Sequence, residues 1–391
     1  MVKHIPRVSI GLPVHNGEKY LAEAVRSVLS QTFGDFELII SDNASTDGTA
    51  AICEHFQAID PRVKYFRSDH NIGAAPNFNR TVAFARGEYF KWLACDDVCR
   101  PEFLERCVAV LDAAPDVLWC CPRTTFIDES GRWIKDPMPE VHSCAAGECG
   151  PVADWTAGAT LVRHPAGRES AKAHERFSAV LHDPWAAFDY YGLIRMEELR
   201  RTGLERPFIG SDKVLVAEWS LTGRFAEVPQ TLQLWRSRPD ALGNRSDLSA
   251  KRIQSGRWDA RFFLPRRVQC TYWYVRLILM SKLPAYERFR CLLTLGHCIC
   301  QPWRWRQLVC EPFGWLKPLT DARRKIEVKD KIDARQTAAM VENGRLGGGG
   351  IVNTPPVANV CRDRGAAHGQ PAAAAILDTN RSSARGHIVK G

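Results

Sequence analysis

Short apolar runs alternate with longer amphipathic segments over the first 128 residues. Five runs have the length and composition of strands: residues 7–13, 36–42, 63–68, 88–95 and 117–128. Four segments between them carry apolar residues at helical spacing: residues 17–31, 45–59, 75–86 and 101–113. In the second of these helices we expect Ile52, Phe56 and Ile59 on the inner face. Strands and helices that alternate with short links predict an α/β fold, a parallel sheet with helices on both faces.

The pattern is less regular after residue 128. The sequence predicts a hairpin at 128–131 and helices within 183–203 and 211–223, followed by a basic, aromatic and helical stretch. Residues 321–335 are typical of a charged helix, and the Gly- and Ala-rich sequence from 344 onward is typical of disorder. We therefore divide the chain into residues 1–245 (with halves 1–128 and 129–245), a basic aromatic helical extension at 246–320, and a charged helix with a disordered tail at 321–391.

Polar residues follow three of the predicted strands. Pro13–Asn16 end the first strand, Asp42–Asn43 end the second, and Asp96–Asp97 follow the fourth. Because ligands bind outside the carboxyl ends of parallel strands, where those ends meet at one edge of the sheet, we expect the three groups to converge on one crevice.

The composition is that of a globular protein. Of 391 residues, 45% are hydrophobic and 25% charged, and the formal net charge is +9. Residues 251–310 hold twelve Lys or Arg against two acids, so the positive charge is regional. The 14 cysteines show no zinc-ligand spacing, and four lie in apolar runs, which predicts buried reduced thiols: Cys53, Cys120, Cys121 and Cys291.

The compartment follows from what the sequence does not contain. The N-terminus has no signal-peptide core, and no apolar run reaches the roughly 18 residues of a membrane-spanning helix. We expect a cytoplasmic protein, with the inner face of the membrane as a second location.

Two adjacent carboxylates after an apolar strand need an explanation. Like charges repel, and burial disfavours the ionised form of a carboxyl group. A hard cation such as Mg²⁺ or Mn²⁺ takes oxygen ligands and, with a bound diphosphate, offsets that repulsion. Asp96 and Asp97 are therefore candidate metal ligands. The alternative is a solvated loop, or a pair that caps the helix beginning at Pro101.

Four stretches of the chain occur in a characteristic order: VSIGLPVHNGEKYLAEAVRSVLSQTF, ELIISDNASTDGT, NIGAAPNFNRTVAFARGEYFKWLACDD and GSDKVLVAEWSLTGRFAEVP. Together they resemble family 2 glycosyltransferases of the GT-A fold, and the resemblance covers roughly residues 5–240. It implies a Rossmann-like mixed, mostly parallel sheet, a nucleotide-diphosphate sugar donor and a Mn²⁺ or Mg²⁺ cofactor. No GxGxxG follows the first strand and no GxxxxGK[ST] occurs, which disfavours a dehydrogenase and a P-loop enzyme.

The resemblance also implies a donor site. It assigns nucleobase recognition to Asp42, whose carboxylate only accepts hydrogen bonds and so suits an imide N–H. The other candidates for nucleotide-sugar binding are Pro13, Val14, His15, Asn16, Glu18, Asn71, Gly73, Asn77, Arg80 and Asp96. Simpler alternatives stay open, because Asp42 and Glu18 also suit the start of a helix, and Asn77 and Arg80 a polar helix face. We interpret Asp47 as a helix cap.

The resemblance places the catalytic base at Asp212, which would take the proton of the acceptor hydroxyl in a single, inverting displacement. Its alternative is a helix N-cap. Arg236 or Arg238 would help stabilise the leaving diphosphate. The family often has a further acid two positions before Asp96, where this chain has Ala94, so the alternatives are a lower metal affinity and ligation mainly by Asp97.

Two features of the C-terminal half are ambiguous. QSGRW (254–258) and QPWRW (301–305) match a Q-x-x-R-W pattern of processive polysaccharide synthases, which we attribute to chance in a sequence rich in Arg and Trp. The basic, aromatic stretch at 251–310 suits contact with an anionic membrane and equally suits a helical cap on the catalytic domain. Nothing in it resembles a nucleic-acid module.

We therefore expect a metal-dependent, inverting glycosyltransferase that acts on a glycan or lipid-linked acceptor in surface polysaccharide or glycan biosynthesis. The alternatives are a nucleotidyltransferase or other nucleotide-sugar enzyme, and a catalytically degenerate, membrane-associated binding or scaffold protein.

Overall fold

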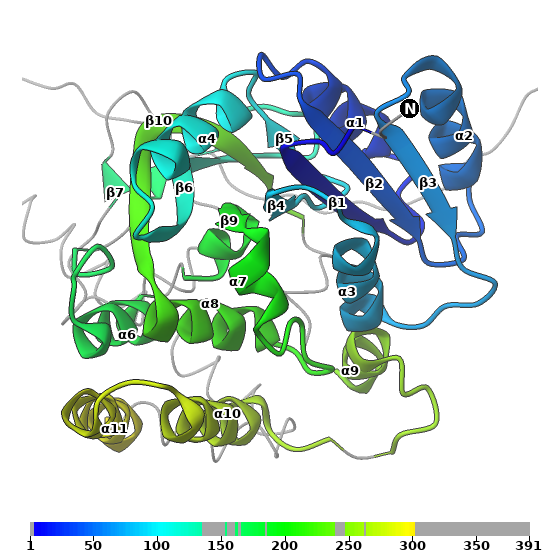
Figure 1. Ribbon diagram of the computed structural model, residues 1–391. Helices are drawn as coiled ribbons and strands as arrows, with labels where there is room; N and C mark the ends of the chain where they lie inside the picture. The colour runs from blue at the N-terminus through cyan, green and yellow to red at the C-terminus, as the bar shows by residue number, and fades with distance from the viewer. Residues whose placement is uncertain are drawn as a thin grey trace, which may run out of the picture. The chain divides into compact units, whose positions relative to one another are not determined.

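The computed structural model describes residues 4–134, 153–154, 161–162, 166–183, 186–238, 247–261 and 263–301 (Figure 1). The chain divides into two units, residues 1–319 and 320–391, and every described residue belongs to the first. The predicted charged helix and disordered tail lie outside the described residues, and the predicted domain boundaries stay predictions.

One mixed sheet carries the fold. Its order is β3-β2-β1-β4-β9-β6-β10-β5. The five predicted strands are confirmed as β1 (Val8–Val14), β2 (Phe36–Asp42), β3 (Val63–Arg67), β4 (Tyr89–Trp92) and β6 (Val117–Ile127). The first four pair in parallel with one another, and β6 pairs in parallel with the unpredicted β10 (Arg224–Arg236). The sheet is thus mostly parallel, as expected.

Short strands complete the sheet where the sequence predicts helix or loop. β9 (Leu193–Arg195) pairs antiparallel with both β4 and β6, inside the stretch for which helical spacing predicts one helix. That stretch holds a 3-10 helix (Ala186–Tyr191), β9 and α7 (Met196–Arg200). β5 (Val98–Cys99) pairs antiparallel with β10, and β7 (Ala153–Asp154) pairs with β8 (Leu161–Val162). Strands of two or three residues are too short to show a period.

Helices cover both faces of the sheet. The predicted helices are confirmed as α1 (Leu21–Leu29), α2 (Thr49–Ile59), α3 (Ala74–Phe84) and α4 (Phe103–Ala113). Side chains of α1, α2 and α4 form one core cluster with the sheet, and α3, α6 (Ala173–His182) and α8 (Ser211–Thr222) contribute to a second. Phe56 is buried, but the expectation for Ile59 is wrong: it ends α2 and is 61% exposed.

The hairpin and the thiols also follow the sequence. The backbone N–H of Asp128 donates to Arg132, Gly131 has a φ of 82°, and Ile127 bridges Trp133, which closes the predicted hairpin. The four cysteines expected as buried thiols are free and buried.

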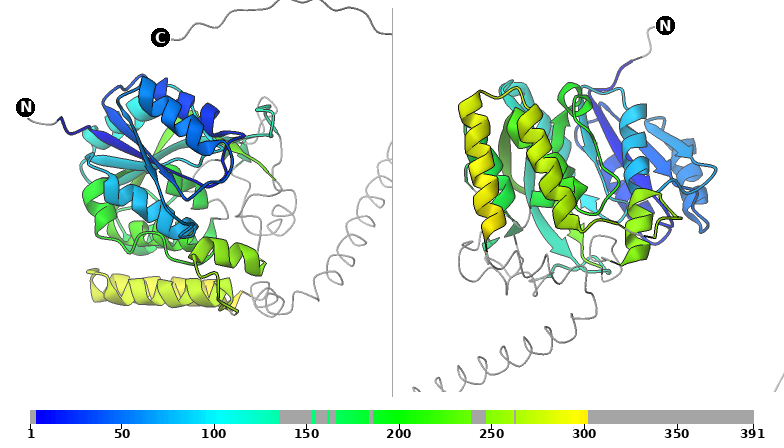
Figure 2. Two further views of the ribbon diagram at one scale, coloured as in Figure 1. Left: turned by 90° about the vertical axis from the view of Figure 1, so that its right-hand side faces the viewer. Right: turned by 90° about the horizontal axis from the view of Figure 1, so that it is seen from below.

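Three further helices follow the sheet: α9 (Leu248–Ser255), α10 (Arg266–Met280) and α11 (Ala285–Cys300). α10 packs on α8, α11 packs on α6, and the two lie side by side on one face (Figure 2). The predicted helical extension is confirmed as far as residue 301. Within the described residues, none of the helices has the length and apolar character required to cross a bilayer.

The start of the QSGRW segment lies directly on the loop before α3. Gly256 has a φ of 69°, and a Cβ added there would lie 2.1 Å from the carbonyl oxygen of Ile72. Gly73, with a φ of 93°, faces Gly256 in the same contact. Both glycines are needed because two backbones approach each other where a side chain does not fit.

Substitution of Gly256 by Ala is therefore expected to lower the free energy of unfolding by about 1–3 kcal/mol, because the backbones must separate and the φ is unfavourable. Gly296→Ala is the matched control: it lies inside α11 with open space around it, and Ala is the better helix former by about 0.8–1.0 kcal/mol. Thermal denaturation should show Gly256→Ala melting below the wild type and Gly296→Ala at or above it. Equal melting of all three would contradict the contact.

Candidate active site

The loops after β1 and β2 and the loop before α3 meet at one edge of the sheet. The Asn43 amide donates to Asn71 Oδ1 at 2.9 Å and to the Gly73 carbonyl at 3.1 Å. Asn71 Nδ2 lies 3.2 Å from Nε2 of His15. Pro13 and Val14, at the end of β1, are buried beneath this network. The convergence predicted for the first two strand ends is therefore present in the structure.

Asn16 and Glu18 join the β1–α1 loop to the β2–α2 loop. Asn16, with a φ of 53°, accepts from the backbone N–H of Thr46 at 2.8 Å. Glu18 accepts from the N–H of Gly48 at 2.9 Å, at the start of α2. Asp47 accepts from the N–H of Thr49 at 3.1 Å, in keeping with its interpretation as a cap. Both acids thus stabilise the start of α2, although Asn16 and Glu18 remain exposed at the edge of the crevice.

Asp42 is fully buried at the end of β2. One carboxylate oxygen accepts from the Ser45 N–H at 2.9 Å and the other from the Tyr65 hydroxyl at 2.8 Å. Arg67 covers it, with Nε 3.8 Å from Oδ2 and Nη2 bound to the Ser45 carbonyl. Each oxygen of Asp42 retains one lone pair, but a ligand reaches it only after Arg67 moves.

Asn77 and Arg80 both bind neighbouring segments of the fold. The Asn77 side chain is buried and binds both the hydroxyl and the carbonyl of Ser41, so it joins α3 to β2. Arg80 binds the Ser68 hydroxyl and the Arg67 carbonyl. Each contact accounts for its residue without a ligand.

Asp96 and Asp97 lie in a turn between β4 and β5, four residues beyond the end of β4. The turn is close to the β1–α1 loop, because a Cβ added at Gly17 would lie 3.4 Å from Cys95 Sγ. Asp97 Oδ1 accepts from the backbone N–H of Arg236 at 2.9 Å. Its Oδ2 is buried and has no hydrogen-bond partner among the described residues. The third strand end thus joins the other two.

Electrostatics make this pair costly. Burial, and then the negative charge of Asp96, raise the pKa of Asp97 well above its usual value. Lys91 and Arg236 oppose the shift. An unpartnered oxygen at the second of two adjacent carboxylates fits a hard cation. No group of three or more His, Cys, Asp or Glu side chains suited to a metal occurs in the described part of the chain.

Two arginines near this pair differ in their exposure and in the contacts that they make. The buried guanidinium of Arg236 donates to the carbonyls of Asp96 and Asp128 and to the carboxylate of Glu23, so it holds three segments together. Arg238 Nε donates to Asp96 Oδ2 at 2.8 Å, and its side chain is 24% exposed. Arg238 is therefore the better candidate for contact with a substrate anion.

Asp212 lies in the first turn of α8, where its carboxylate accepts from the neighbouring N–H of Lys213 at 2.8 Å. Nearby, Glu205 is buried and accepts from Ser211 Oγ and from Gln254 Nε2, while its Oε2 has no partner among the described residues. Burial, and then the charge of Asp212, raise the pKa of Glu205 to about 8. Asp212 thus shares its surroundings with a second, unpredicted acid.

The QSGRW segment contacts both this pair of acids and the loop before α3. Gln254 binds Glu205, and Trp258 Nε1 donates to the Asn71 carbonyl at 3.1 Å. These two contacts place the QSGRW segment beside the candidate site. Apart from Gln301, QPWRW lies outside the described residues.

Tyr191 is a further candidate site residue, which no pattern in the sequence predicted. Burial and the charges of Asp97 and Asp212 raise its pKa well above the usual value, so it lies within the field of both acidic groups. Its ring meets Trp235 edge-on, with the ring centroids 5.5 Å apart. Tyr191 ends a 3-10 helix directly before β9, which no periodic signal marks.

Comparison with known proteins agrees with this arrangement. A model of glycosyl transferase family 2 matches residues 9–165, the part that holds β1, β2, β4 and the Asp96–Asp97 turn. This N-terminal part of the chain is thus similar to family 2 glycosyltransferases. An uncharacterized glycosyltransferase of Methanocaldococcus jannaschii is 32% identical over 139 residues, which cover 35% of this chain and 48% of the relative. Chondroitin synthase of Escherichia coli is 36% identical over 137 residues, 34% of this chain and 20% of the relative.

The fold extends beyond the sequence match. The chain superposes on the crystal structure of S. aureus TarS 1-349 in complex with UDP-GlcNAc with a TM-score of 0.50 and 15% identity, over 78% of this chain and 79% of that one. The likeness confirms the expected GT-A fold. The chain spans about half or less of the length of the curated relatives it matches.

The raised pKa of Glu205 predicts a pH-dependent stability. A carboxyl group whose pKa is higher in the folded state stabilises the fold below its unfolded pKa, and that contribution is lost as pH rises toward about 8. Glu205→Gln keeps the shape but does not ionise. As the pH rises from 5 to about 8, the free energy of unfolding of the wild type should therefore fall relative to that of Glu205→Gln. Denaturant titration at each pH measures both values.

The control for this prediction is Glu197→Gln, at an exposed acid on α7. It should show no such shift. A Glu205→Gln curve parallel to that of the wild type across this pH range would contradict the burial argument.

Proposed function

We propose that this chain transfers a sugar from a nucleoside diphosphate donor to an acceptor hydroxyl, with inversion at the anomeric carbon. One observation carries the proposal: in the part of the chain that matches the glycosyl transferase family 2 model, a buried carboxylate oxygen of Asp97, beside Asp96, has no partner among the described residues. A buried polar group left unpaired costs about 1–3 kcal/mol, and more if charged. A ligand that completes this oxygen explains why the arrangement is retained.

Asp97 and Asp96 are the residues that would hold Mn²⁺ or Mg²⁺. When bound, such an ion supplies positive charge to the diphosphate as it departs. Arg238 complements this role, since its guanidinium already lies at Asp96 and is partly exposed. We propose that Arg238 turns from Asp96 to a phosphate oxygen of the donor. Arg236 then acts as a positioning residue that keeps the turn in place.

We propose that the nucleobase of the donor binds at the hydrogen-bond network that follows β1 and β2. His15, Asn16 and Asn71 present polar atoms at its surface, and Gly73 leaves room for the backbone to approach a ligand. For Asp42 to accept an imide N–H, the half-exposed side chain of Arg67 has to move from above it. The S. aureus protein of similar fold was solved with UDP-GlcNAc, and a nucleotide sugar of that class is the donor we propose.

Asp212 acts as the general base in this proposal. Its carboxylate takes the proton of the acceptor hydroxyl, whose oxygen bonds to the anomeric carbon. The bond from that carbon to the diphosphate oxygen breaks, and its electron pair leaves with the nucleoside diphosphate. One base suffices for a single displacement, and the electron balance requires no other reactant.

The acceptor is proposed from the relatives alone. Chondroitin synthase of E. coli is named for a polysaccharide product. By analogy we propose a glycan or lipid-linked acceptor in polysaccharide assembly.

The role of Asp97 is tested by Asp97→Asn. Activity with the correct donor should fall about 100-fold or more, because one oxygen ligand is lost where charge develops. The folded state should not suffer, because a neutral amide replaces a buried, incompletely paired carboxylate. Melting in EDTA at or above the wild-type temperature, together with low activity, is the expected result. Full activity, or low activity explained by unfolding, would contradict the metal role.

The role of Asp212 is tested by Asp212→Asn, which should lower kcat by about 10²–10⁴-fold with little change in donor affinity. Asp116→Asn is a matched control, because Asp116 is exposed and paired only with Arg224 at the far end of the sheet. The product should be free nucleoside diphosphate. Release of pyrophosphate would indicate a nucleotidyltransferase, and donor binding without any turnover would indicate a degenerate binding protein.

A further inference from the structure

The outer faces of α10 and α11 gather most of the exposed apolar side chains in the described part of the chain. Eight large apolar residues there are between 39% and 68% exposed: Leu264, Val268, Tyr272, Leu279, Met280, Tyr286, Phe289 and Leu293. The other exposed large apolar residues are scattered along the chain: Ile5, Ile59, Trp133, Leu248 and Trp258. Scattered exposed residues need no explanation, but a contiguous set marks an interaction surface.

Helical spacing places these residues on one stripe per helix. In α10, Val268, Tyr272 and Leu279 recur at steps of four and seven. In α11, Tyr286, Phe289 and Leu293 recur at steps of three and four. The opposite sides of both helices pack inward through Ile278, Cys291 and Leu295, among others. The stripes therefore face away from α6 and α8, and the helices that carry them lie side by side (Figures 1 and 2).

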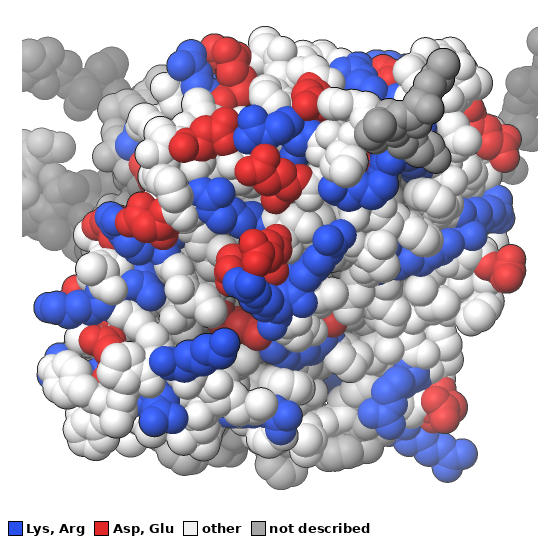
Figure 3. Space-filling model, viewed as in Figure 1, with Lys and Arg blue, Asp and Glu red and all other residues white. Residues whose placement is uncertain are grey.

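The charge around the stripes is of one sign. Residues 263–301 hold six Lys or Arg: Arg266, Arg267, Arg276, Lys282, Arg288 and Arg290. Their one acid, Glu287, accepts hydrogen bonds from the backbone and ring of His174 on α6. In Figure 3, white atoms broken by blue run over α10 and α11 along the lower edge of the molecule. The surface is apolar and cationic together.

We infer that the α10–α11 face, defined as the eight exposed apolar residues and the six cations above, docks on an anionic lipid bilayer. Aromatic and aliphatic side chains enter the boundary between headgroups and acyl chains, while Arg and Lys bind anionic headgroups. Charge complementarity favours this partner over a second copy of the chain, since two identical cationic faces repel each other. Because the helices are amphipathic, they lie along the bilayer surface.

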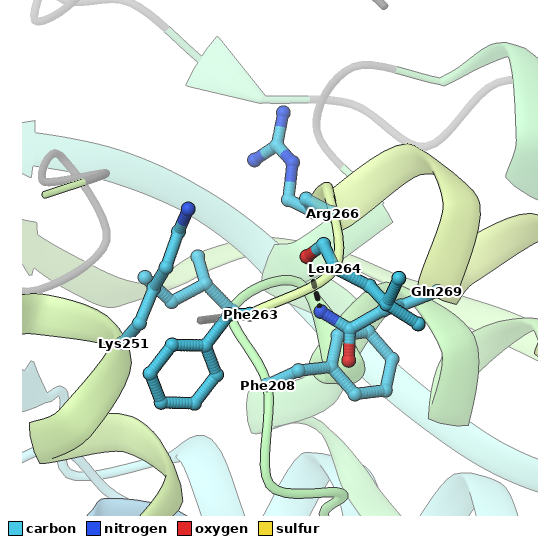
Figure 4. Close-up of a pocket in the computed structure, with 7 residues that line it drawn as sticks. Phe208, Lys251, Phe263, Leu264, Arg266 and Gln269 are labelled. Atoms are coloured by element: carbon cyan, nitrogen blue, oxygen red, sulfur yellow. Dashed lines mark hydrogen bonds between the residues drawn. The ribbon is translucent and has the colours of Figure 1, made fainter. Parts of the chain in front are cut away.

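The same face leads toward the candidate base. A recess at the start of α10 is lined by Phe208, Lys251, Phe263 and Arg266, and its two cations extend to the same side (Figure 4). The Arg266 side chain also lies against Gly210, where an added Cβ would meet Cδ at 2.9 Å. Gly210 precedes α8, the helix of Asp212. If the proposed function holds, docking therefore brings a lipid-linked acceptor toward Asp212.

Vesicle co-sedimentation of the full chain tests the inference. We expect binding to phosphatidylcholine vesicles that contain phosphatidylglycerol at low salt, and binding at least about tenfold weaker at high salt or without phosphatidylglycerol. Leu279→Ser/Phe289→Ser should weaken binding about tenfold or more, because two apolar side chains no longer insert. Ile5→Ser/Ile59→Ser, with equal exposure elsewhere, should bind like the wild type.

Several results would overturn the inference. The first is no binding of the wild type at low salt, and the second is equal binding by the stripe variant (Leu279→Ser/Phe289→Ser) and its control (Ile5→Ser/Ile59→Ser). The third is a concentration-dependent dimer of the wild type that the stripe variant abolishes and the control variant does not. The last would make the face an interface between copies. Transfer to a soluble acceptor separates docking from catalysis, because the stripe variant should retain that activity even where vesicle binding is lost.

Discussion

The site depends on two adjacent carboxylates, Asp96 and Asp97, which lie in the turn between β4 and β5. The protein positions them with strong contacts: the Arg236 backbone binds Asp97, the Arg236 guanidinium binds the Asp96 carbonyl, and Arg238 binds the Asp96 carboxylate. Yet one buried oxygen of Asp97 has no hydrogen-bond partner in the part of the chain that the structure describes. Because many donors lie nearby and none reaches this oxygen among the described residues, we propose that the turn is organised around a ligand rather than around maximum stability.

The sheet brings a second acidic group to the same region. Asp212 begins α8, and Glu205 is buried beside it and bound by Gln254. Tyr191 lies within the field of both groups. The two acidic groups thus come together from different halves of the chain. β9 makes this possible, because it pairs with β4 on one side and β6 on the other.

Much of the first half was predictable because its strands and helices are long enough to show a period. The carboxyl-end rule then placed Pro13–Asn16, Asp42–Asn43 and the Asp96–Asp97 turn together correctly. It could not show that Asn77 turns inward or that Arg67 covers Asp42, since both depend on packing between distant segments. β9 and Glu205 left no local signal: one is a three-residue strand, and the other an acid whose importance lies in its burial.

The central claim is that a divalent cation joins the carboxylate pair to a diphosphate. The direct measurement is calorimetric titration of a nucleoside diphosphate into the full chain, with Mn²⁺ and with EDTA. The account predicts affinity at least about tenfold higher with Mn²⁺, and no such difference in Asp97→Asn, because cation and diphosphate bind as one unit. Equal affinity under both conditions in the wild type would contradict it.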